Sequence, residues 1–355
     1  MIKIIFLFLI FAQIYYLSSS ATLTEKEKLD KAQKIVDKAN AKNKGKWIAK
    51  LHHRIAKLEK HSVMLGAKLK VPKKQVSTPV KTNLRRKRSI PASFDVRTGF
   101  ASCAGIVGMI QVIRNLINKK SFKQDQSSCG DCWAVSTASA LTDRYCISQV
   151  KKGNSAPLKT NPSVYFSALE LMSCTPGMWG CGGGDPYYAW KYTQTSGLVT
   201  GTNYTWNSGC KPYPFPPHGS TEYTAPSCVS SCTSSAWNVA YTQDKKYTKT
   251  TGYIQSNVAA IQNEIMANGS VVAAFDVYDD FMYYSSGQTS DVYVGGHAVR
   301  MIGWGTDTYP DGTHLDYWLC ANQWNYDWGM NGYFKIARGV DECGIESSEI
   351  SFGTF

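Results

Sequence analysis

All eleven cysteines of this 355-residue chain lie after residue 100, so the sequence divides into a cysteine-free leader and a cysteine-rich body. Such a density is typical of proteins that fold in an oxidising compartment, where cysteines form disulfides. Because eleven is an odd number, at least one thiol stays free or pairs with another molecule. We therefore expect a disulfide-bonded body, in which a catalytic thiol would account for an unpaired cysteine.

The basic charge of the chain is confined to the same leader. Residues 1–88 hold 22 Lys and Arg against 5 Asp and Glu, a net charge of +17, whereas residues 89–355 hold 17 against 21, a net charge of −4. The overall charge of +13 therefore does not describe the body, and we expect no nucleic-acid partner. The opposite charges favour an attraction between the leader and the body.

The leader begins with an apolar run, Ile4 to Leu17, which follows Lys3 and ends in small residues. This length fits the core of a secretory signal peptide and is short for a membrane-spanning helix. We expect residues 1–21 to be a cleaved signal peptide and no later segment to span a membrane. The protein is thus expected to be lysosomal or extracellular.

The rest of the leader, residues 22–88, is rich in lysine and ends in the basic run Arg85–Arg88. A basic run is often only a solvated face, but this one separates two compositions and resembles a site for processing proteases. Five apolar residues upstream recur at helical spacing: Trp47, Ile48, Leu51, Ile55 and Leu58. Basic amphipathic helices also bind membranes or partner grooves, but the acidic body favours an intramolecular partner. We expect a helical pro-segment at 22–88 and a mature domain at 89–355.

The body changes character along its length. Its first part contains helix-compatible segments at 133–147 and 168–172, followed by a Pro-, Gly- and Ser-rich irregular stretch at 211–235. A short helix is expected at 258–268, and four later runs have the pattern of strands: 271–277, 297–302, 317–321 and 333–336. A helical half followed by a strand-rich half predicts an α+β domain with a cleft between two lobes.

The segment Gln126–Ala134 carries the strongest chemical signal. It leads from a polar loop into an apolar helical segment, so Cys132 falls at or just inside a helix N-terminus. Unpaired amide groups and the helix dipole there stabilise a thiolate and lower the pKa of the thiol. Cys132 is therefore predicted to be a nucleophile, and the side-chain amide of Gln126 is placed to donate to an oxyanion beside it.

Other functions fit the same cysteines less well. Cys129 and Cys132 form a C-x-x-C pair, which occurs in zinc sites and redox-active disulfides. The chain has no second C-x-x-C pair, and the residues before Cys129 do not resemble a strand entering a βαβ unit. We therefore expect no metal site and no cofactor. A structural disulfide is the commonest fate of a cysteine in a secreted chain, so the nucleophile hypothesis needs a base.

His297 is the best candidate for this base. It follows Gly295 and Gly296 and begins a strand, so bare backbone beside its ring would let a peptide approach. A structural histidine is the other interpretation. The remaining histidines of the body, His218 and His314, lie in turn-like segments and are expected at the solvated surface.

Asn322 ends another predicted strand, two residues before Trp324. Its amide oxygen could accept a hydrogen bond from one imidazole nitrogen and so fix the tautomer that leaves the other nitrogen facing the thiol. Trp324 would shield that hydrogen bond from water.

Together these motifs resemble the papain family of cysteine peptidases, and in detail its cathepsin B branch. The resemblance spans nearly the whole mature chain and depends on six motifs in the family's order: Gln126–Ala134, Glu170–Cys174, Cys181–Gly184, Gly295–Ala298, Ala321–Trp324 and Cys343–Ser347. It implies a papain-like two-lobed fold, in which a helical lobe and a β-barrel-like lobe enclose the active-site cleft. It also implies peptide or protein substrates, an inhibitory pro-segment across the cleft, and cystatin-type inhibitors as further partners.

The resemblance implies roles for individual residues. A Cys132 thiolate would pair with a His297 imidazolium, Asn322 would orient the ring, and Gln126 would form the oxyanion hole with the Cys132 amide. The implied substrate-binding residues are Gly183, Gly184, Asp185, Pro186, Gly296, Ala298, Trp324 and Ser348. The implied disulfides are Cys103–Cys146, Cys129–Cys181, Cys174–Cys228 and Cys210–Cys232, which leave Cys132, Cys320 and Cys343 unpaired.

Two departures from the family pattern concern the catalytic cleft. Asp131 replaces the usual serine, and a carboxylate turned inward there would raise the pKa of the neighbouring thiol. The segment Cys210–Cys232 is shorter than the occluding loop that gives cathepsin B its exopeptidase activity, and it offers only His218. We therefore expect mainly endopeptidase activity, with weak exopeptidase activity.

A third departure concerns specificity. Ser348 stands where the mammalian enzyme has a glutamate that accepts basic side chains. Pro186 and Ala298 would then select aliphatic or aromatic residues at P2, the second residue before the cleaved bond, while Asp185 would restore some tolerance of arginine.

Asn203 and Asn268 begin N-glycosylation sequons and are expected to carry glycans. The alternative to an enzyme is a catalytically inactive secreted binding protein on the same fold. The presence of Cys132, His297 and Asn322 favours the enzyme.

Overall fold

The computed structural model describes residues 23–43, 48–58, 61–68, 89–108, 125–219, 221–286 and 293–355. The expected signal peptide and the basic run Arg85–Arg88 lie outside these residues. Within the described chain, none of the helices combines the length and the apolarity needed to cross a bilayer.

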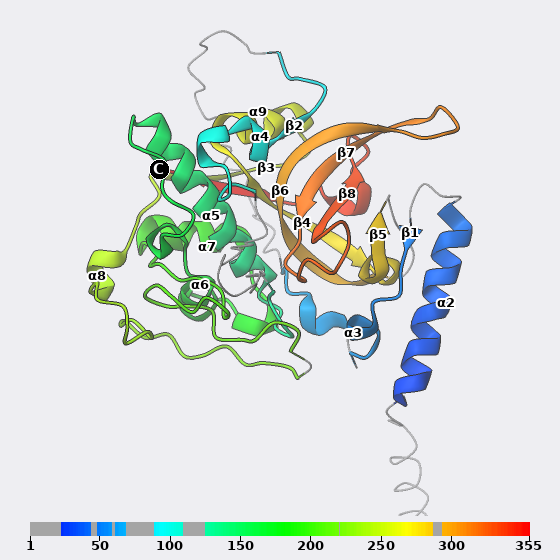
Figure 1. Cartoon of the computed structure of the whole chain (residues 1–355), viewed down its shortest axis with the longest axis horizontal. Coiled ribbons are helices and arrows are strands. Elements are labelled where there is room, and N and C mark those ends of the chain that lie inside the picture. The colour runs from blue at the N-terminus through cyan, green and yellow to red at the C-terminus, as the bar shows by residue number, and fades with distance from the viewer. Residues whose placement is uncertain are drawn as a thin grey trace, which may run out of the picture.

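A helical lobe and a sheet lobe lie side by side (Figure 1). The helical lobe contains α5 (Cys132–Lys151), α6 (Ala168–Cys174), α7 (Pro186–Thr195) and α8 (Tyr241–Asp244). The sheet lobe carries α4 (Val96–Gly99) and α9 (Val258–Asn268). Short 3₁₀ turns are η1 (His61–Met64), η2 (Ala101–Cys103), η3 (Pro162–Val164), η4 (Gly180–Gly182), η5 (Asp279–Tyr283) and η6 (Glu342–Gly344). The predicted two-lobed α+β architecture is confirmed.

The main sheet is antiparallel, with the neighbour order β3-β9-β4-β6-β7-β8 and with β2 paired to β6. Its strands are β2 (Phe94–Asp95), β3 (Thr250–Ile254), β4 (Val271–Tyr278), β6 (Tyr293–Thr308), β7 (His314–Ala321), β8 (Tyr333–Ala337) and β9 (Ile350–Thr354). Among the described strands β3 and β8 end the order and are each paired on one side only, so the barrel-like closure implied by the family resemblance is replaced by an open, curved sheet (Figure 1). A register shift between Met301 and Gly303 accompanies the bend of β6, as irregularities of this kind commonly do.

Helix α5 is buried on nearly all sides because it packs between α6 and α7 of its own lobe and β6 of the other. Four of its hydroxyl groups would be costly to bury without partners. Each donates to the carbonyl oxygen four residues earlier, at 2.6–3.0 Å (Ser136, Thr137, Ser139 and Thr142). The buried helix thus places Cys132, its first residue, at the junction of the two lobes.

The sequence pattern did not predict α7. Its first turn has a clear start signal, because the Asp185 side chain accepts a hydrogen bond from the Tyr187 amide (2.9 Å) and Pro186 occupies the first turn. The aromatic residues that follow have intrinsic preferences closer to strands than to helices, which obscures the helical period.

The leader is helical, as predicted, but the helix lies elsewhere. Helix α2 (Glu25–Asn43) buries Ala32, Val36 and Ala39 along one face and packs on β1 (Ile48–Ala49) and η5. At its start, Thr24 and Glu27 exchange hydrogen bonds in a capping box (2.8 and 3.3 Å).

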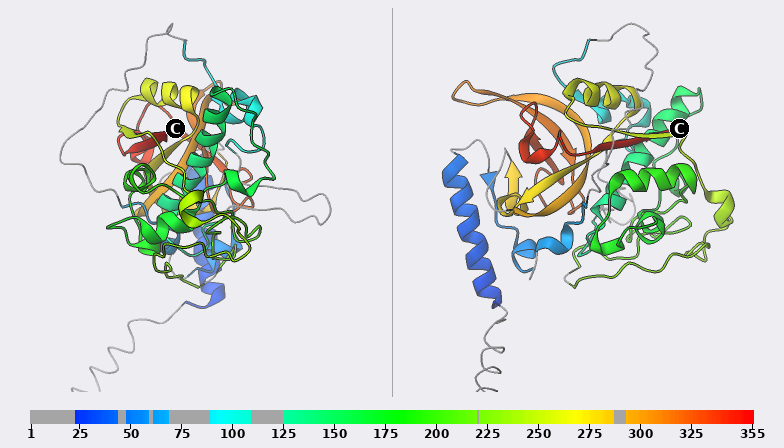
Figure 2. Two further views of the ribbon diagram at one scale, coloured as in Figure 1. Left: turned by 90° about the vertical axis from the view of Figure 1, so that its left-hand side faces the viewer. Right: turned by 180° about the vertical axis from the view of Figure 1, so that it is seen from behind.

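The helix predicted from the spacing of apolar residues at 47–58 is wrong. Ile48 and Ala49 form β1, which pairs with β5 (Tyr284–Ser286), and only His53–Ala56 (α3) are helical. Pairing with a distant strand therefore overrides the local period. Figure 2 shows that α2 stands against the outer side of the sheet lobe, while α3 lies under the junction of the lobes.

The four disulfides implied by the resemblance are present: Cys103–Cys146, Cys129–Cys181, Cys174–Cys228 and Cys210–Cys232. Cys132 and Cys320 are free and buried, and Cys343 is free and half-buried.

Candidate active site

Cys132 begins α5 and has no exposed surface in this structure. Burial raises the pKa of the Cys132 thiol to about 12, and the backbone amides of Ala298, Gly66 and Trp133 act in the opposite direction. Ala298 belongs to β6 of the other lobe and Gly66 belongs to the leader. The thiol is therefore enclosed by both lobes and by the leader.

His297 lies in β6, beside the residue whose amide faces the thiol. Its Nε2 donates to Oδ1 of Asn322 (2.8 Å), and its ring stacks on Trp324 with centroids 4.7 Å apart. Because a carbonyl oxygen only accepts, this bond places the hydrogen on Nε2 and leaves a lone pair on Nδ1 in the neutral ring. Nδ1 is buried without a hydrogen-bond partner among the described residues, so it is available as a base.

The covered site does not favour the thiolate–imidazolium pair that the resemblance implies. Burial lowers the pKa of His297 to about 4, although the hydrogen bond to Asn322 acts in the opposite direction. Together with the raised pKa of Cys132, this makes a neutral thiol and a neutral imidazole the stable forms. The physical reason is that the cleft is closed, and an ion pair would lose its hydration there.

Gln126 lies in the loop before α5, with its side-chain nitrogen directed into the cleft. Nε2 donates to the carbonyl oxygens of Cys129 (2.7 Å) and of Met64 in the leader (3.0 Å). The main-chain amide of Gln126 donates to the Gln323 carbonyl (2.9 Å), which connects this loop to the end of β7. The predicted oxyanion donor is thus already bonded to a peptide carbonyl oxygen.

The leader crosses the cleft as an extended strand. The Gly184 amide donates to the Gly66 carbonyl (2.8 Å), and the Gly184 carbonyl accepts from the Lys68 amide (2.9 Å). From the other lobe, the Gly296 carbonyl accepts from the Ala67 amide (3.0 Å). Two of the glycines in the predicted substrate-binding set, Gly184 and Gly296, therefore bind the leader backbone in this structure.

Close backbone approach explains these glycines. A Cβ on Gly184 would lie 2.4 Å from the Trp133 ring, and one on Gly296 would lie 2.4 Å from the Ala67 carbonyl oxygen. Gly183 has φ 114°, in the region that favours glycine, and a Cβ there would lie 2.8 Å from the Gly66 oxygen.

The remaining predicted substrate-binding residues lie in three places: at the start of α7, beside Cys132 and before β9. Asp185 and Pro186 follow Gly184 directly and are buried at the start of α7, while Ala298 is buried beside Cys132. Ser348 is half-buried in the segment before β9.

Sequence reasoning missed the acidic residue after Ser348. Glu349 is 2% exposed, and its Oε1 has no hydrogen-bond partner among the described residues. Burial, reinforced by the Asp185 carboxylate, raises the pKa of Glu349 to about 8. Its position next to Ser348 was the available signal.

The shortened loop, Cys210–Cys232, is fastened to the segment before the nucleophile. The His218 amide donates to Asp125 Oδ2 (3.1 Å), the Gly219 amide donates to Ser127 Oγ (3.0 Å), and Ser128 Oγ donates to the Gly219 carbonyl (2.5 Å).

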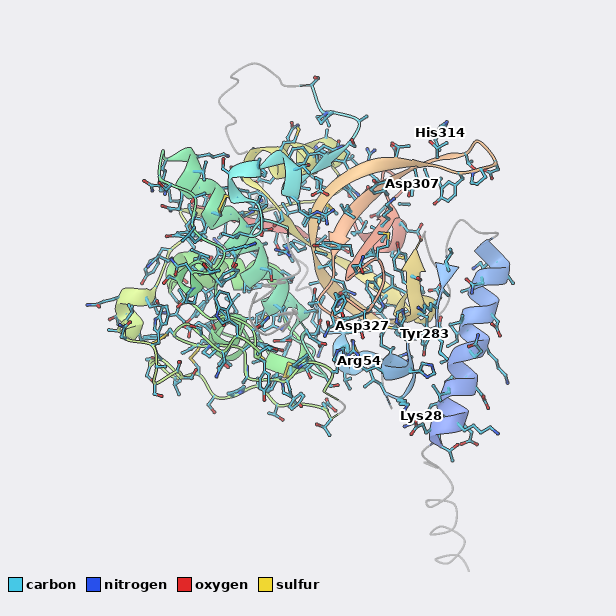
Figure 3. All side chains as sticks on the ribbon, viewed as in Figure 1. Lys28, Arg54, Tyr283, Asp307, His314 and Asp327 are labelled. Atoms are coloured by element: carbon cyan, nitrogen blue, oxygen red, sulfur yellow. A yellow bond between two sulfur atoms is a disulfide. The ribbon has the colours of Figure 1, made fainter. Side chains whose placement is uncertain are left out.

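The imidazoles expected at the solvated surface differ from each other. His218 lies at the surface as expected, with its side chain 36% exposed, but its ring also has polar neighbours: Nδ1 lies 3.7 Å from Asp125 Oδ2 and Nε2 lies 3.0 Å from Asn325 Nδ2. His314 is exposed on β7, at one end of the sheet lobe (Figure 3).

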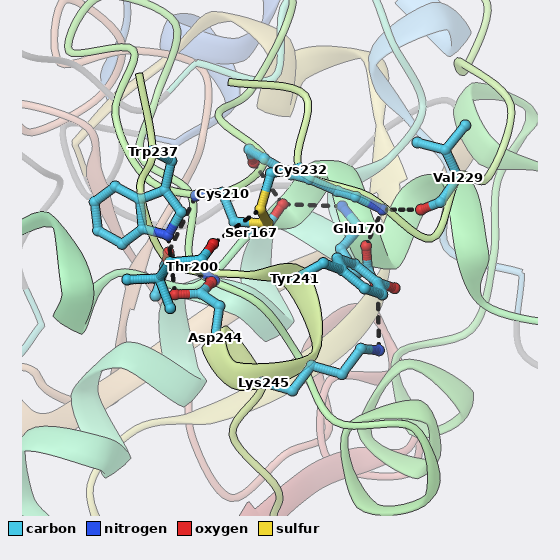
Figure 4. Close-up of a disulfide and its surroundings, with 12 residues drawn as sticks. Ser167, Glu170, Thr200, Cys210, Val229, Cys232, Trp237, Tyr241, Asp244 and Lys245 are labelled. Atoms are coloured by element: carbon cyan, nitrogen blue, oxygen red, sulfur yellow. Dashed lines mark hydrogen bonds and ion pairs between the residues drawn. A yellow bond between two sulfur atoms is a disulfide. The ribbon is translucent and has the colours of Figure 1, made fainter. Parts of the chain in front are cut away.

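A buried charge cluster holds the base of this loop (Figure 4). Glu170 on α6 pairs with Lys211, which also donates to the Val229 carbonyl, and Glu170 accepts from the hydroxyls of Tyr192 (2.7 Å) and Tyr241 (2.6 Å). Burial alone would raise the pKa of Glu170, but these hydrogen bonds outweigh it and hold the pKa below the usual value. A paired and fully hydrogen-bonded charge of this kind fixes the loop beside the Cys210–Cys232 disulfide.

Residues 117–352 match the family model described as papain family cysteine protease. This chain belongs to the papain family of cysteine proteases. It is 42% identical over 277 residues to cathepsin B-like cysteine proteinase 6 of Caenorhabditis elegans, which covers 74% of this chain and 66% of that protein. It is 37% identical over 342 residues to cathepsin B-like cysteine proteinase 5 of the same organism, covering 90% of this chain and 89% of the relative.

Among solved structures, proCathepsin B S9 from Trypanosoma congolense is similar with a TM-score of 0.71 and 31% identity, covering 94% of this chain and 99% of that one. Digestive procathepsin L 3 of Tenebrio molitor shares the fold, with a TM-score of 0.62 and 19% identity over 97% of this chain and 96% of the other.

These relatives are papain-family zymogens or cathepsin B-like proteinases, so the predictions of a papain-like fold and of a cathepsin B-like cysteine peptidase are confirmed. The leader is the pro-segment of a zymogen and acts as an intramolecular inhibitor. Within the described residues, no group of three or more His, Cys, Asp or Glu side chains is arranged to hold a metal ion.

Proposed function

We propose that the mature domain, residues 89–355, is a cysteine endopeptidase with Cys132 as nucleophile and His297 as base. The observation that carries this proposal is the state of the imidazole. Its Nε2 is committed to Asn322 while its Nδ1 is buried and unbonded among the described residues, and the adjacent Ala298 amide faces the Cys132 sulfur.

Departure of the pro-segment removes the burial that keeps both groups neutral. Cys132 then transfers its proton to Nδ1 of His297, and the thiolate attacks the peptide carbonyl. Gln126 Nε2, now released from Met64, and the Cys132 amide donate to the oxyanion. The imidazolium protonates the leaving amine, which gives a thioester, and His297 then activates the water that hydrolyses it. Asn322 keeps the ring in place throughout.

Residues 1–21 are proposed to be a signal peptide and 22–88 the pro-segment, removed by cleavage after the basic run Arg85–Arg88. The destination would be a lysosome or the extracellular space. Of the two sequons, Asn268 is the more exposed, since Asn203 is only 9% exposed. A glycan at Asn268 would replace the hydrogen bond that its Nδ2 donates to Glu264 Oε1 (3.0 Å).

Exopeptidase activity is proposed to be weak. Binding of a substrate's terminal carboxylate needs an accessible cation, and the short loop offers only the His218 imidazole. Both nitrogens of that ring already lie near polar atoms of Asp125 and Asn325. The cleft is therefore suited to protein substrates that are cleaved at internal peptide bonds. Cystatin-type inhibitors would bind in the same cleft.

At P2, the mature enzyme would prefer substrates with aliphatic or aromatic side chains, because Pro186 and Ala298 would form apolar walls of the pocket. Asp185 is fully buried and caps α7, so the arginine tolerance expected from it would depend on the Asp185–Glu349 pair rather than on Asp185 alone.

The test uses purified protein before and after removal of the pro-segment, with a peptide library and a thiol-reactive epoxide probe. We expect turnover only after removal and much faster labelling after removal than before it, and both should be lost in Cys132→Ala. The matched control is Cys343→Ala, which removes the half-buried free thiol and should leave both unchanged. Correctly folded mature protein that neither cleaves the library nor reacts with the probe would favour an inactive binding protein instead.

A further inference from the structure

Two buried polar side chains behind the oxyanion hole have no role in the mechanism above. Asp131 directly precedes Cys132 and has no exposed surface, yet its carboxyl group makes no capping hydrogen bond to α5. The Tyr213 hydroxyl lies 3.1 and 3.0 Å from its two oxygens. The same hydroxyl lies 2.9 Å from the main-chain oxygen of Gln126. Tyr213, from the loop Cys210–Cys232, thus connects the two segments that supply the oxyanion donors.

The number of hydrogen atoms available for hydrogen bonds indicates whether the Asp131 carboxyl group is protonated. A phenol has one hydrogen to donate, but Tyr213 faces two possible acceptors, the Gln126 carbonyl and the Asp131 carboxyl group. With an ionised Asp131, the phenol could satisfy only one of the two acceptors, and a charge would be buried with only its own main-chain amide and that phenol as donors. With a protonated Asp131, the acid donates to the Tyr213 oxygen and Tyr213 donates to the Gln126 oxygen. Only the protonated form satisfies every group.

The electrostatic surroundings point the same way. Burial raises the pKa of Asp131 well above its usual value, although hydrogen bonds from Tyr213 and from the Asp131 main-chain amide act against this. The titratable groups that act on Tyr213, besides Asp131, include Asp125 on the preceding loop and Cys132 on α5. Both are acids, so neither supplies a counter-charge. The imidazoles of His218 and His297 face Asp125 and Asn322 respectively.

We propose that Asp131 works as a neutral carboxylic acid which, through Tyr213, positions Gln126 and Cys132 for oxyanion stabilisation, and that its ionisation limits the enzyme to acidic conditions. An Asp131 carboxylate would place a negative charge one residue from the sulfur. It would oppose formation of the thiolate and of the oxyanion, and it would take the Tyr213 hydrogen away from Gln126. Asp131 and Tyr213 are thus positioning residues, and this inference rests on the proposed function.

The test compares kcat/KM of the mature enzyme from pH 4 to 9 with that of Asp131→Asn. The amide of an asparagine donates to Tyr213 at every pH, as the protonated acid does. We expect the wild type to lose activity as pH rises through the titration of Asp131, and Asp131→Asn to keep it. One pH unit above that midpoint, the variant should exceed the wild type about tenfold.

Tyr213→Phe should lower kcat by about fivefold, the effect of one hydrogen bond, with KM less affected. The matched control is Tyr223→Phe. Tyr223 lies in the same loop and stacks on Phe215 with ring centroids 4.4 Å apart. The Tyr223→Phe substitution also removes one hydroxyl, but it should not change kcat. Superimposable pH profiles for wild type and Asp131→Asn would overturn the proposal. So would a uniform loss of activity in Asp131→Asn, because it would show that the carboxylate is the working form.

A second readout does not require activity and so separates this proposal from the proposed function. In the zymogen carrying Cys132→Ala, infrared difference spectra against the same protein with Asp131→Asn should contain a protonated carboxylic acid band at neutral pH. A difference spectrum with only a carboxylate band would refute a neutral Asp131, whether or not the wild type hydrolyses peptides.

Discussion

Gly66→Ala should release the pro-segment from the cleft without altering the mature enzyme. A Cβ at this position would lie 1.6 Å from the main-chain oxygen of Gly130, and contacts of this kind are essentially never shorter than 3.0 Å. The contact is with backbone at the start of the disulfide-bonded segment before α5, so the pro-segment must move. Gly66 does not have a positive φ, so the effect comes from this contact and not from backbone strain.

The magnitude follows from the hydrogen bonds near Gly66. Four connect the pro-segment to the cleft: two with Gly184, one with Gly296, and one from Gln126 to Met64, at 2.8–3.0 Å. Each contributes about 0.5–1.5 kcal/mol net. A shift large enough to relieve the contact would break at least two of them, at a cost of about 1–3 kcal/mol. The fraction of zymogen with an open cleft should then rise about 5- to 150-fold.

The assay is the rate at which a thiol-reactive epoxide labels Cys132 in the intact zymogen, since this rate is proportional to the open fraction. Lys34→Ala, a change at an exposed position of α2, serves as the control and should label at the wild-type rate. After processing, all forms should label at one common rate because Gly66 is absent from the mature domain. Equal labelling of the Gly66→Ala and wild-type zymogens would refute the path of the pro-segment described above.

Three further predictions concern the base, the pro-segment and a buried acid. Asn322→Ala should lower kcat about a hundredfold with little change in KM, because His297 loses the hydrogen bond that fixes its ring; steady-state kinetics with unchanged kcat would contradict this. Burial lowers the pKa of His52 and His61 in the docked pro-segment below 6.5, so docking should weaken as pH falls and these rings charge. Processing of a His52→Gln, His61→Phe zymogen should therefore need lower pH than the wild type. The pKa of Glu349 is raised from 4.5 to about 8 in the folded state, so its contribution to stability is complete below pH 4.5 and lost as pH rises to 8. In urea unfolding of the zymogen, the free energy of unfolding should fall with rising pH by a few kcal/mol less in Glu349→Gln than in the wild type. The same pH dependence of this free energy in both proteins would argue against the prediction.

The histidine prediction has a clear structural basis. His61 of the pro-segment faces Tyr283 of η5, with ring centroids 5.9 Å apart and Nε2 3.4 Å from the hydroxyl. His52 Nε2 lies 3.1 Å from the Tyr284 carbonyl oxygen, and Arg54 donates to the Trp324 carbonyl (2.8 Å). The opposite charges of the leader and the body already give one reason for activation by acid, because protonation of carboxylates in the body weakens their attraction for the basic leader. The buried rings provide a second, local reason for it.

Much of the fold and the chemistry of the site were predictable because they are encoded locally. The strands around His297 and before Asn322 have short apolar runs that end in glycine or polar residues, and the helix after Cys132 begins with the apolar run Trp133–Val135. The order of the motifs then linked three residues that are far apart in the chain.

Other features depend on contacts that no local pattern encodes. Ile48 belongs to β1 because Ser286 lies opposite it, more than two hundred residues later. Tyr213 lies in an irregular loop without any period, so its approach to Asp131 required the folded chain. The pairing of Glu349 with Asp185 likewise joins two elements, the segment before β9 and the start of α7, that are separated in sequence.

The contacts of α2, β1 and α3 with the body lie far upstream of the basic run Arg85–Arg88. Cutting the chain there severs the tether but breaks none of the hydrogen bonds at Gly66 or Lys68. The immediate product is then a two-chain complex, whose inhibitor is lost by dissociation. Onset of proteolysis should accordingly lag behind the cut, and the lag should shorten on dilution or when the freed peptide is itself digested.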